Sequence, residues 1–326
     1  MRPFLEAVVI RCRLEVRLMA GETMRALAAE VASQCDVLAR FSKSKLPRAS
    51  KGSIFVGAGD SYAAALAGFH RSMGRCIALD PYTLASAPEI AQGLEVFFIS
   101  VSGRTASNVA AANRVTRIAK RTTVLTADDE SPLAKQAERV VRLPMSYVPR
   151  TPGMLSFSLS LLAVLIIAAG REPIDFRRAF VNAKKDQGRP SLGKGTTYFL
   201  GNSLAYPIAL YTAAKAYELL GSKAHAELLE EFSHLELFSL AREDAVNAFS
   251  CFDPSGMAAK LTRALSEEGY RSSLVPSRGV SDLERLFHSV FVAQLSVLEE
   301  ATMLGISEPK FLAAGGRLRT SDSMIY

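Results

Sequence analysis

The sequence predicts an α/β fold of two tandem doubly wound units, each with a mostly parallel sheet flanked by helices. Short apolar runs without alternation indicate strands that are buried on both faces, and segments of helical length separate them. The transition from Ile54-Phe-Val56 into Gly57-Ala-Gly-Asp-Ser61 returns as Thr196–Leu200 followed by Gly201-Asn-Ser203. Such a return of one pattern favours two copies of a unit, at about 50–170 and 195–304, over one continuous sheet. The alternative, that any two α/β halves look alike, stays open.

The first unit follows an N-terminal helix expected at about 19–41 and a segment rich in Lys, Ser and Pro. Apolar runs predict its strands at 53–56, 76–79, 96–99, 122–126 and 140–143. Helices are expected at 62–73, near 85, and at 106–120 and 132–137. A strongly apolar helix is expected at 157–170, at the end of this unit. It is too short to span a bilayer, so a buried position is expected for it.

The second unit begins after a polar linker expected at 177–195. Strands are expected at 196–200, 245–252 and 272–275, and helices at 205–220, from 257 to 269 and at 282–304. Strands alternating with helices in this way are typical of a parallel, doubly wound sheet.

Composition narrows the class of protein. Hydrophobic residues make up 49% of 326, enough for a large core. The net charge of +7 is dispersed and the chain has no Trp, which argues against nucleic-acid binding and suits an anionic small substrate. No membrane association is expected. Residues 1–18 lack the continuous apolar stretch of a secretory signal and are expected to be an extension of little function.

Four cysteines are scattered along the chain without the spacing of a metal site: Cys12, Cys35, Cys76 and Cys251. This pattern predicts a reducing, cytoplasmic location and no zinc. A metal site built from His225 and neighbouring carboxylates is a weaker alternative.

The segment 96–105 carries the clearest chemical signal. A run of large apolar residues ends in Ser100-Val-Ser-Gly-Arg-Thr105, which offers three hydroxyl groups just before a helix. The peptide dipoles of that helix add positive potential to the same place, so the loop predicts a phosphate site. The alternative is an ordinary turn in which Thr105 caps the helix.

Several motifs together resemble the sugar isomerase (SIS) domain family, in particular the two-SIS isomerase half of glucosamine-6-phosphate synthase (glutamine:fructose-6-phosphate amidotransferase). The resemblance covers about residues 20–318. It is carried by Gly59-Asp-Ser61, Ser100–Thr105, the apolar helix behind Thr151, Leu200–Leu210 with Lys215-Ala-Tyr-Glu218, and Glu231-Phe-Ser-His234. It implies an N-terminal helical segment at 1–50, a first SIS domain with the phosphate loop at 51–176, and a second SIS domain with the catalytic residues and a C-terminal tail at 195–326.

The resemblance also assigns roles to residues. It implies phosphate binding by Ser61, Ser100, Val101, Ser102, Gly103 and Thr105, and sugar binding by Gly59, Asp60 and Thr151. Glu218 is the candidate base: its helix is largely apolar, so we expect partial desolvation to raise its pKa. Lys215, one turn earlier, either stabilises an enediolate oxygen or simply pairs with Glu218. His234 stands where the family has its ring-opening histidine, which enters from a second subunit and so implies a homodimer.

These features predict a phosphosugar isomerase that interconverts aldose and ketose hexose 6-phosphates through a cis-enediol, without a metal or nucleotide cofactor. A glucosamine-6-phosphate deaminase is the first alternative, and a non-catalytic sugar-phosphate sensor is the second. Departures from the synthase leave the sugar open: Ala314 stands in place of a sugar-binding lysine, Leu235-Glu236 in place of Gly-Pro, and Arg104 in place of Glu.

Overall fold

A computed structural model describes residues 21–326 of the chain. The extension expected at 1–18, Cys12 and the first residues of the helix expected from 19 lie outside the described residues. Helix α2 (Glu22–Phe41) occupies the rest of that helix, and Met24, Leu27, Val31 and Leu38 on one face are buried. Apolar residues at helical spacing thus fix which face packs against the protein.

Two separate parallel sheets form the framework. The first has five strands in the order β2-β1-β3-β4-β5: β1 (Ile54–Val56), β2 (Ile77–Leu79), β3 (Glu95–Ile99), β4 (Arg121–Thr126) and β5 (Arg139–Arg142). The second has four strands in the order β7-β6-β8-β9: β6 (Thr197–Leu200), β7 (Ala224–Glu227), β8 (Ala245–Phe249) and β9 (Arg271–Val275). All strand pairs are parallel. The predicted α/β class with parallel sheets is therefore confirmed.

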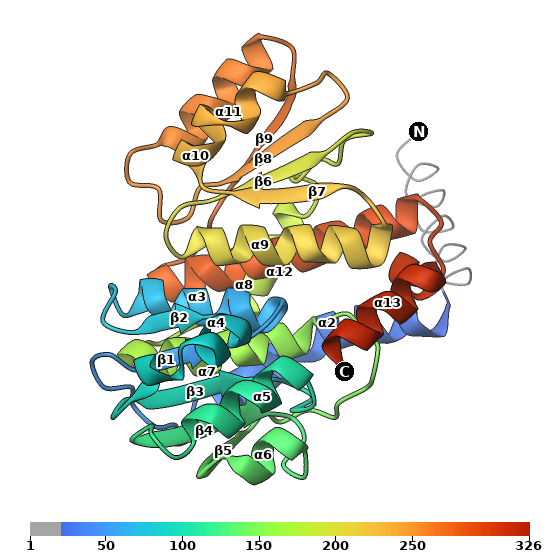
Figure 1. Ribbon diagram of the computed structural model, residues 1–326. Coiled ribbons are helices and arrows are strands. Elements are labelled where there is room, and N and C mark those ends of the chain that lie inside the picture. Colours follow the sequence, from blue (N-terminus) through green and yellow to red (C-terminus); the bar gives the residue numbers. More distant parts are fainter. Residues whose placement is uncertain (1–20) are drawn as a thin grey trace.

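Helices lie between the two sheets and on both outer faces (Figure 1). The layer between the sheets contains α2 with α3 (Asp60–Arg71), α7 (Leu155–Ala169), α8 (Phe176–Asp186), α9 (Ala205–Lys215) and α12 (Asp282–Met303). The first sheet is covered outside by α4 (Pro81–Ser86), α5 (Ala106–Val115) and α6 (Pro132–Gln136), and the second by α10 (Leu229–His234) and α11 (Met257–Glu267). Both faces of each sheet are therefore covered by helices.

Side chains of successive strand residues point to opposite faces, and both faces are buried. In β1, Phe55 joins the large core between the sheets, whereas Ile54 and Val56 pack under the outer helices. In β6, Phe199 and Leu200 divide in the same way. Burial on both sides explains why these strands read as continuous apolar runs.

Three expectations about elements are corrected. The linker expected at 177–195 begins with helix α8, whose Phe176, Ala179 and Phe180 are buried against α12. Its apolar residues recur at helical spacing, a signal that the many basic residues of this segment conceal. Strand β7 was not expected, because its sequence Ala-His-Ala-Glu has no apolar run. Helix α5 ends at Val115, five residues earlier than expected.

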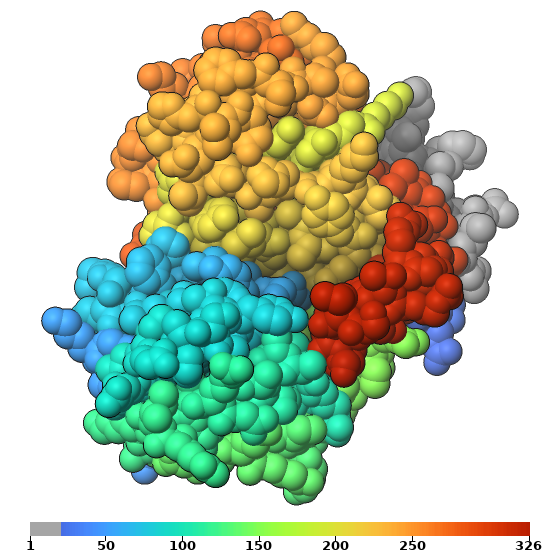
Figure 2. Space-filling model, in the orientation of Figure 1, coloured from blue at the N-terminus to red at the C-terminus, as the bar shows by residue number. Residues whose placement is uncertain are grey.

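The C-terminal residues of the chain lie next to its first half. After the turn η4 (Lys310–Ala313), helix α13 (Gly316–Ile325) lies along the boundary between the two halves (Figure 2). The carboxyl ends of β1 and β3 face the same region, which is where ligands bind in doubly wound folds. Among the described residues, no helix is long and apolar enough to cross a membrane.

Candidate functional site

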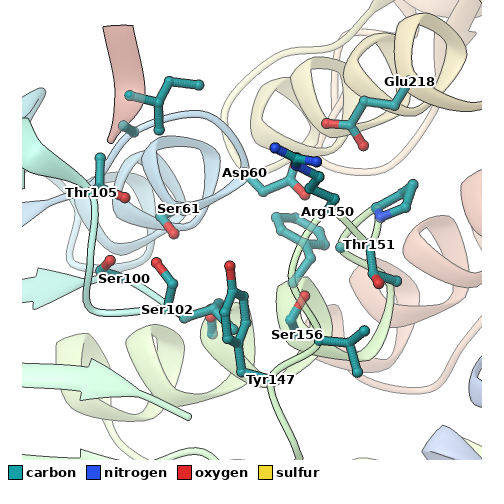
Figure 3. A pocket seen from close by; sticks show the side chains of 18 of the residues that line it. Asp60, Ser61, Ser100, Ser102, Thr105, Tyr147, Arg150, Thr151, Ser156 and Glu218 are labelled. Carbon is teal, nitrogen blue, oxygen red and sulfur yellow. The ribbon is translucent and has the colours of Figure 1, made fainter. Parts of the chain in front are cut away.

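A cavity of about 440 Å³ opens at the carboxyl ends of β1 and β3. Its wall comes from both halves of the chain and from the C-terminal residues. Figure 3 shows hydroxyl groups gathered on one side of this cavity, whereas the carboxyl groups of Asp60 and Glu218 lie on the other. Eight residues singled out from the sequence line it: Asp60, Ser61, Ser100, Val101, Ser102, Thr105, Thr151 and Glu218.

The loop after β3 is held rigidly. The Gly103 amide donates to Ser100 O at 3.0 Å, and the Leu133 amide donates to Gly103 O at 3.1 Å. Thr126 Oγ1 donates to Val101 O at 3.0 Å. Gly103 has φ +60°, and a Cβ there would lie 2.0 Å from Ser131 Oγ. Only glycine therefore fits this position, although Gly103 itself does not line the cavity.

The hydroxyl of Thr105 is not used as a helix cap. Thr105 occupies the N-cap position of α5, but its side chain makes no capping hydrogen bond. It points to the cavity, as do Ser100 and Ser102, whose side chains are largely buried. Ser61 adds a hydroxyl from the first turn of α3. Four neutral donors beside two helix N-termini form a place that suits an anion.

Arg104 turns away from this loop toward the neighbouring one. Its Nη2 pairs with Asp128 Oδ2 at 2.7 Å, and it does not line the cavity. The pKa of Asp128 is held below its ordinary value mainly by the hydrogen bond from Arg104. Arg104 thus braces the loops after β3 and β4.

In the corresponding loop of the second sheet, an aspartate occupies the backbone amides at the start of the following helix. After β8, Asp253 accepts hydrogen bonds from the Met257 amide at 3.2 Å and the Ala258 amide at 2.7 Å, at the start of α11. The amides that would attract an anion are already occupied there. Only the first of these two loops is open to a phosphate group.

Lys215 joins two carboxylates at the cavity wall. Its Nζ lies 2.8 Å from Asp60 Oδ2 and 2.5 Å from Glu218 Oε2, and its side chain is 1% exposed. The side chains of Asp60 and Glu218 are 21% and 36% exposed. The expected pairing of Lys215 with Glu218 is present, but it lies inside the protein and includes Asp60. Lys215 itself sits behind the wall and does not line the cavity.

Burial and charge shift the pKa values of this group. Burial raises the pKa of Asp60 to about 6, Lys215 opposes the rise, and Glu218 adds to it. Burial by itself would lower the pKa of the Lys215 amine, but the two carboxylates outweigh it and raise that pKa above its ordinary value. Lys215 is therefore charged at neutral pH.

The backbone changes form where Glu218 lies. Helix α9 ends at Lys215 and continues as a π-helical turn, η2 (Ala216–Leu220), which closes at Gly221 in the left-handed conformation. The regular helix expected at 205–220 is corrected accordingly. π-Helical turns are rare and occur frequently at functional sites.

Gly59 and His234 do not line the cavity. Gly59 precedes α3 with φ +58°, and the start of that helix places Asp60 and Ser61. His234 lies on α10, is 69% exposed and contacts Glu230 Oε1 at 3.3 Å. The structure therefore does not bring His234 to the cavity of its own chain.

Among residues 21–326, one cluster has the spacing of metal ligands: His225, Glu227 and Glu236. His225 Nε2 lies 3.2 Å from Glu236 Oε1 and 3.7 Å from Glu227 Oε2. Carboxylates beside a half-exposed imidazole are common without a bound ion, so this arrangement does not by itself indicate a metal.

Several residues of the cavity wall have no functional signal in the sequence. The segment 145–153 contributes Tyr147 and Arg150, and the C-terminal helix contributes Asp322 and Tyr326. Arg150 has φ +57° and pairs with Asp322 Oδ2 at 2.7 Å, which ties α13 to the cavity. Burial, reinforced by Tyr326, raises the pKa of Tyr147 to about 12. No local pattern identifies these residues, because they meet only through packing.

Three buried polar atoms of the lining have no hydrogen-bond partner among the described residues: Asp60 Oδ1, Asn108 Oδ1 and Ser160 Oγ. Buried polar groups in native proteins are nearly always satisfied. Their concentration at this cavity indicates a polar ligand. Asn108 has one sequence signal, its place in the first turn of the helix that follows the hydroxyl loop.

Residues 48–169 match the family model for the SIS domain. No curated protein gives a significant match to the chain. Among solved structures, the chain is similar to glucosamine-6-phosphate deaminase from Thermotoga maritima, with 22% identity, a TM-score of 0.66 and coverage of 86% of this chain and 95% of that one. It is also similar to the C-terminal domain of glucosamine-fructose-6-phosphate aminotransferase from Francisella tularensis, with 15% identity, a TM-score of 0.68 and coverage of 86% of this chain and 95% of that one. A third similar structure is tagatose-6-phosphate ketose/aldose isomerase from Escherichia coli, with 16% identity, a TM-score of 0.63 and coverage of 91% of each chain. At these identities the likeness establishes the fold.

Proposed function

We propose that this chain is a phosphosugar isomerase that interconverts aldose and ketose hexose 6-phosphates through a cis-enediol. One observation carries the proposal: a single cavity holds a hydroxyl-lined anion loop on one side and the Asp60 and Glu218 carboxyl groups on the other. The SIS domain match at 48–169 and the fold shared with an isomerase and a deaminase support it.

In this proposal the phosphate is held by the hydroxyls of Ser61, Ser100, Ser102 and Thr105 and by the backbone around Val101 and Gly103. Fixing the phosphate turns remote binding into alignment of the reacting carbons. Glu218 takes the proton from C2 of the aldose and returns it to C1, which yields the ketose. Lys215, behind the cavity wall, keeps Glu218 in place through its ion pair. Gly59, Asp60 and Thr151 complete the sugar contacts.

The proposal includes a homodimer in which His234 of one copy opens the sugar ring in the cavity of the other. The face around His234 supports this: Leu235 and Phe238 are 59% and 84% exposed, which leaves an apolar surface for a partner to cover. Mixing inactive Glu218→Gln and His234→Asn subunits should restore roughly a quarter of the activity, since half of the random dimers then contain one intact site.

We further propose residues 51–176 and 195–326 as two SIS-type units after the N-terminal segment 1–50. The shared strand order supports this, as does the position of Gly57 and Gly201, where a Cβ would strike the start of the following helix in both halves. A cytoplasmic location is supported by Cys35, Cys76 and Cys251, which are buried and free.

The test is turnover by Glu218→Gln. With glucose 6-phosphate, we expect a loss of at least ~100-fold in kcat and in exchange of the C2 proton with deuterated solvent; with fructose 6-phosphate, we expect the same loss in kcat and in exchange of a C1 proton. Glu267→Gln, on an exposed position of α11, is the matched control. Full turnover by Glu218→Gln would exclude the proposed mechanism.

A second candidate is glucosamine-6-phosphate deaminase, which the two carboxylates favour because they suit an ammonium group on C2. Release of ammonia from glucosamine 6-phosphate, without isomerisation of fructose 6-phosphate, would establish it. If neither substrate reacts while a sugar phosphate raises Tm, the chain is a sensor.

A further inference from the structure

We propose that Asp60 is a second proton-exchanging residue of this cavity, which moves the proton between the C1 and C2 oxygens of the sugar while Glu218 moves the proton between the carbons. This inference rests on the proposed function and extends it, since a carboxyl group that only bound the sugar would transfer no proton.

The isomerisation requires two proton transfers, and one base does not serve both well. As Glu218 removes the C2 proton of the aldose, the carbonyl oxygen on C1 must gain a proton to give the enediol. As the carbon proton returns to C1, the hydroxyl on C2 must lose one to give the ketone. In the proposed cycle the protonated Asp60 donates to O1 and then accepts from O2, so that both carboxyl groups end as they began.

The position of Asp60 suits this task. It is the first residue of α3, it lines the cavity, and Lys215 binds it and Glu218 through the same ammonium group. Both carboxyl groups are therefore fixed relative to each other. Gly153 permits the approach of the facing loop, because a Cβ there would lie 2.6 Å from Asp60 Oδ2.

One oxygen of Asp60 is free to exchange a proton. Lys215 occupies Oδ2, whereas Oδ1 is buried and has no partner among the described residues. A buried carboxylate oxygen is satisfied either by a donor from a ligand or by a proton of its own. By contrast, the partly buried Glu30 at the same cavity uses one oxygen to accept from the Leu155 amide, at the start of α7.

The groups that face Asp60 keep both of its protonation states accessible. Lys215 on α9 favours the anion, whereas Glu218 on η2 and burial favour the neutral acid. Tyr211 on α9 stays neutral, since burial and Asp60 raise its pKa well above the ordinary value. Glu30 on α2 lines the same cavity, and burial raises its pKa, whereas Arg150 there is paired with Asp322. The pKa of Asp60, about 6, allows proton exchange near neutral pH.

The experiment compares Asp60→Asn, Asp60→Glu and the control Asp80→Asn, which changes an aspartate at the start of α4, outside the cavity. With fructose 6-phosphate, Asp60→Asn should lower kcat by ~100-fold or more, leave KM within about threefold, and remove the ionisation near pH 6 from the kcat/KM profile. Asp60→Glu should regain part of kcat and restore that ionisation. Asp80→Asn should resemble the wild type.

Two results would overturn the inference. If the wild type isomerises the sugar and Asp60→Asn keeps its kcat and its pH profile, Asp60 is only a counter-ion of Lys215. If Asp60→Asn lowers kcat but keeps the ionisation near pH 6 in the kcat/KM profile, Asp60 acts by positioning Glu218 and not by exchanging a proton with the oxygens.

Failure of the proposed function is recognised separately. If the wild type turns over no hexose phosphate, the reaction is excluded, and glucitol 6-phosphate then tests Asp60 by calorimetry. A proton taken up or released on binding by the wild type and by Asp60→Glu, but not by Asp60→Asn, supports proton exchange at Asp60. Equal proton linkage in all three proteins overturns it.

Discussion

Replacing Lys215 by methionine provides a direct test of the carboxylate pair at the cavity wall. Methionine keeps the length of the side chain but removes the charge that Asp60 and Glu218 share. Removing one partner of a buried ion pair typically costs about 3–5 kcal/mol, because the remaining charge is left uncompensated. The two carboxylates retain some contact with water, so we expect about 3 kcal/mol, the lower end of that range.

The loss should depend on pH, and its sign follows from the proton affinity of Asp60. Burial already raises the pKa of Asp60 to about 6, and Lys215 holds it down, so the variant has a still higher pKa. A carboxyl group that binds its proton more tightly when folded stabilises the fold at low pH, and this stabilisation is lost as the pH rises through the folded pKa. The destabilisation by Lys215→Met should therefore be largest near neutral and alkaline pH.

Urea unfolding followed by circular dichroism, at about pH 5 and about pH 8, measures the effect. Lys184→Met, an exposed lysine on α8, is the matched control and should stay within about 0.5 kcal/mol at both pH values. Adding Asp60→Asn to Lys215→Met should recover part of the loss at the higher pH. A loss that is the same at both pH values, or no loss at all, would refute this account of the pair.

Three further predictions concern the loops and the C-terminal helix. Gly103→Ala should raise KM for the sugar phosphate at least ~10-fold and lower Tm, because its Cβ would meet Ser131. Gly93→Ala, where φ is also positive (+71°) but the space is open, should lower Tm by less and leave KM unchanged. Asp253→Ala should destabilise the fold by ~1 kcal/mol through loss of the α11 cap, as measured by urea unfolding, and leave kcat/KM unchanged. Arg150→Gln should release α13, seen as faster proteolytic cleavage within 315–326; cleavage at the wild-type rate would show that its pair with Asp322 is dispensable.

Much of the framework could be predicted from local sequence. The apolar runs at 54–56 and 96–99 identify strands because residues buried on both faces must all be apolar. Strand β7 could not be identified in this way, since a half-exposed edge strand needs no such run. Helix α8 was hidden by basic residues on its exposed face, although its buried face keeps helical spacing.

The residues of the candidate site also fall into two groups: those that a local sequence pattern predicts and those that only tertiary packing brings to the cavity. The hydroxyl loop at 100–105 is continuous in sequence, so it could be predicted that its hydroxyl residues, with Ser61, lie together at one cavity. Whether Thr105 caps its helix or faces the cavity, and whether Arg104 approaches the anion or Asp128, depends on neighbouring loops. Arg150 and the residues of α13 reach the cavity only because the chain folds back over it.

By itself, the sequence determined the α/β class, the hydroxyl-rich loop after β3 and the chemical types of the catalytic candidates, because short-range patterns of burial, glycine and hydroxyl groups govern these features. Only the tertiary structure decided that Lys215 holds Asp60 and Glu218 together, although these carboxyl groups lie in different halves of the chain. It also decided that His234 lies outside the cavity of its own chain. The physical reason is that charges far apart in sequence acquire an interaction energy only when packing removes water from between them and fixes their distance.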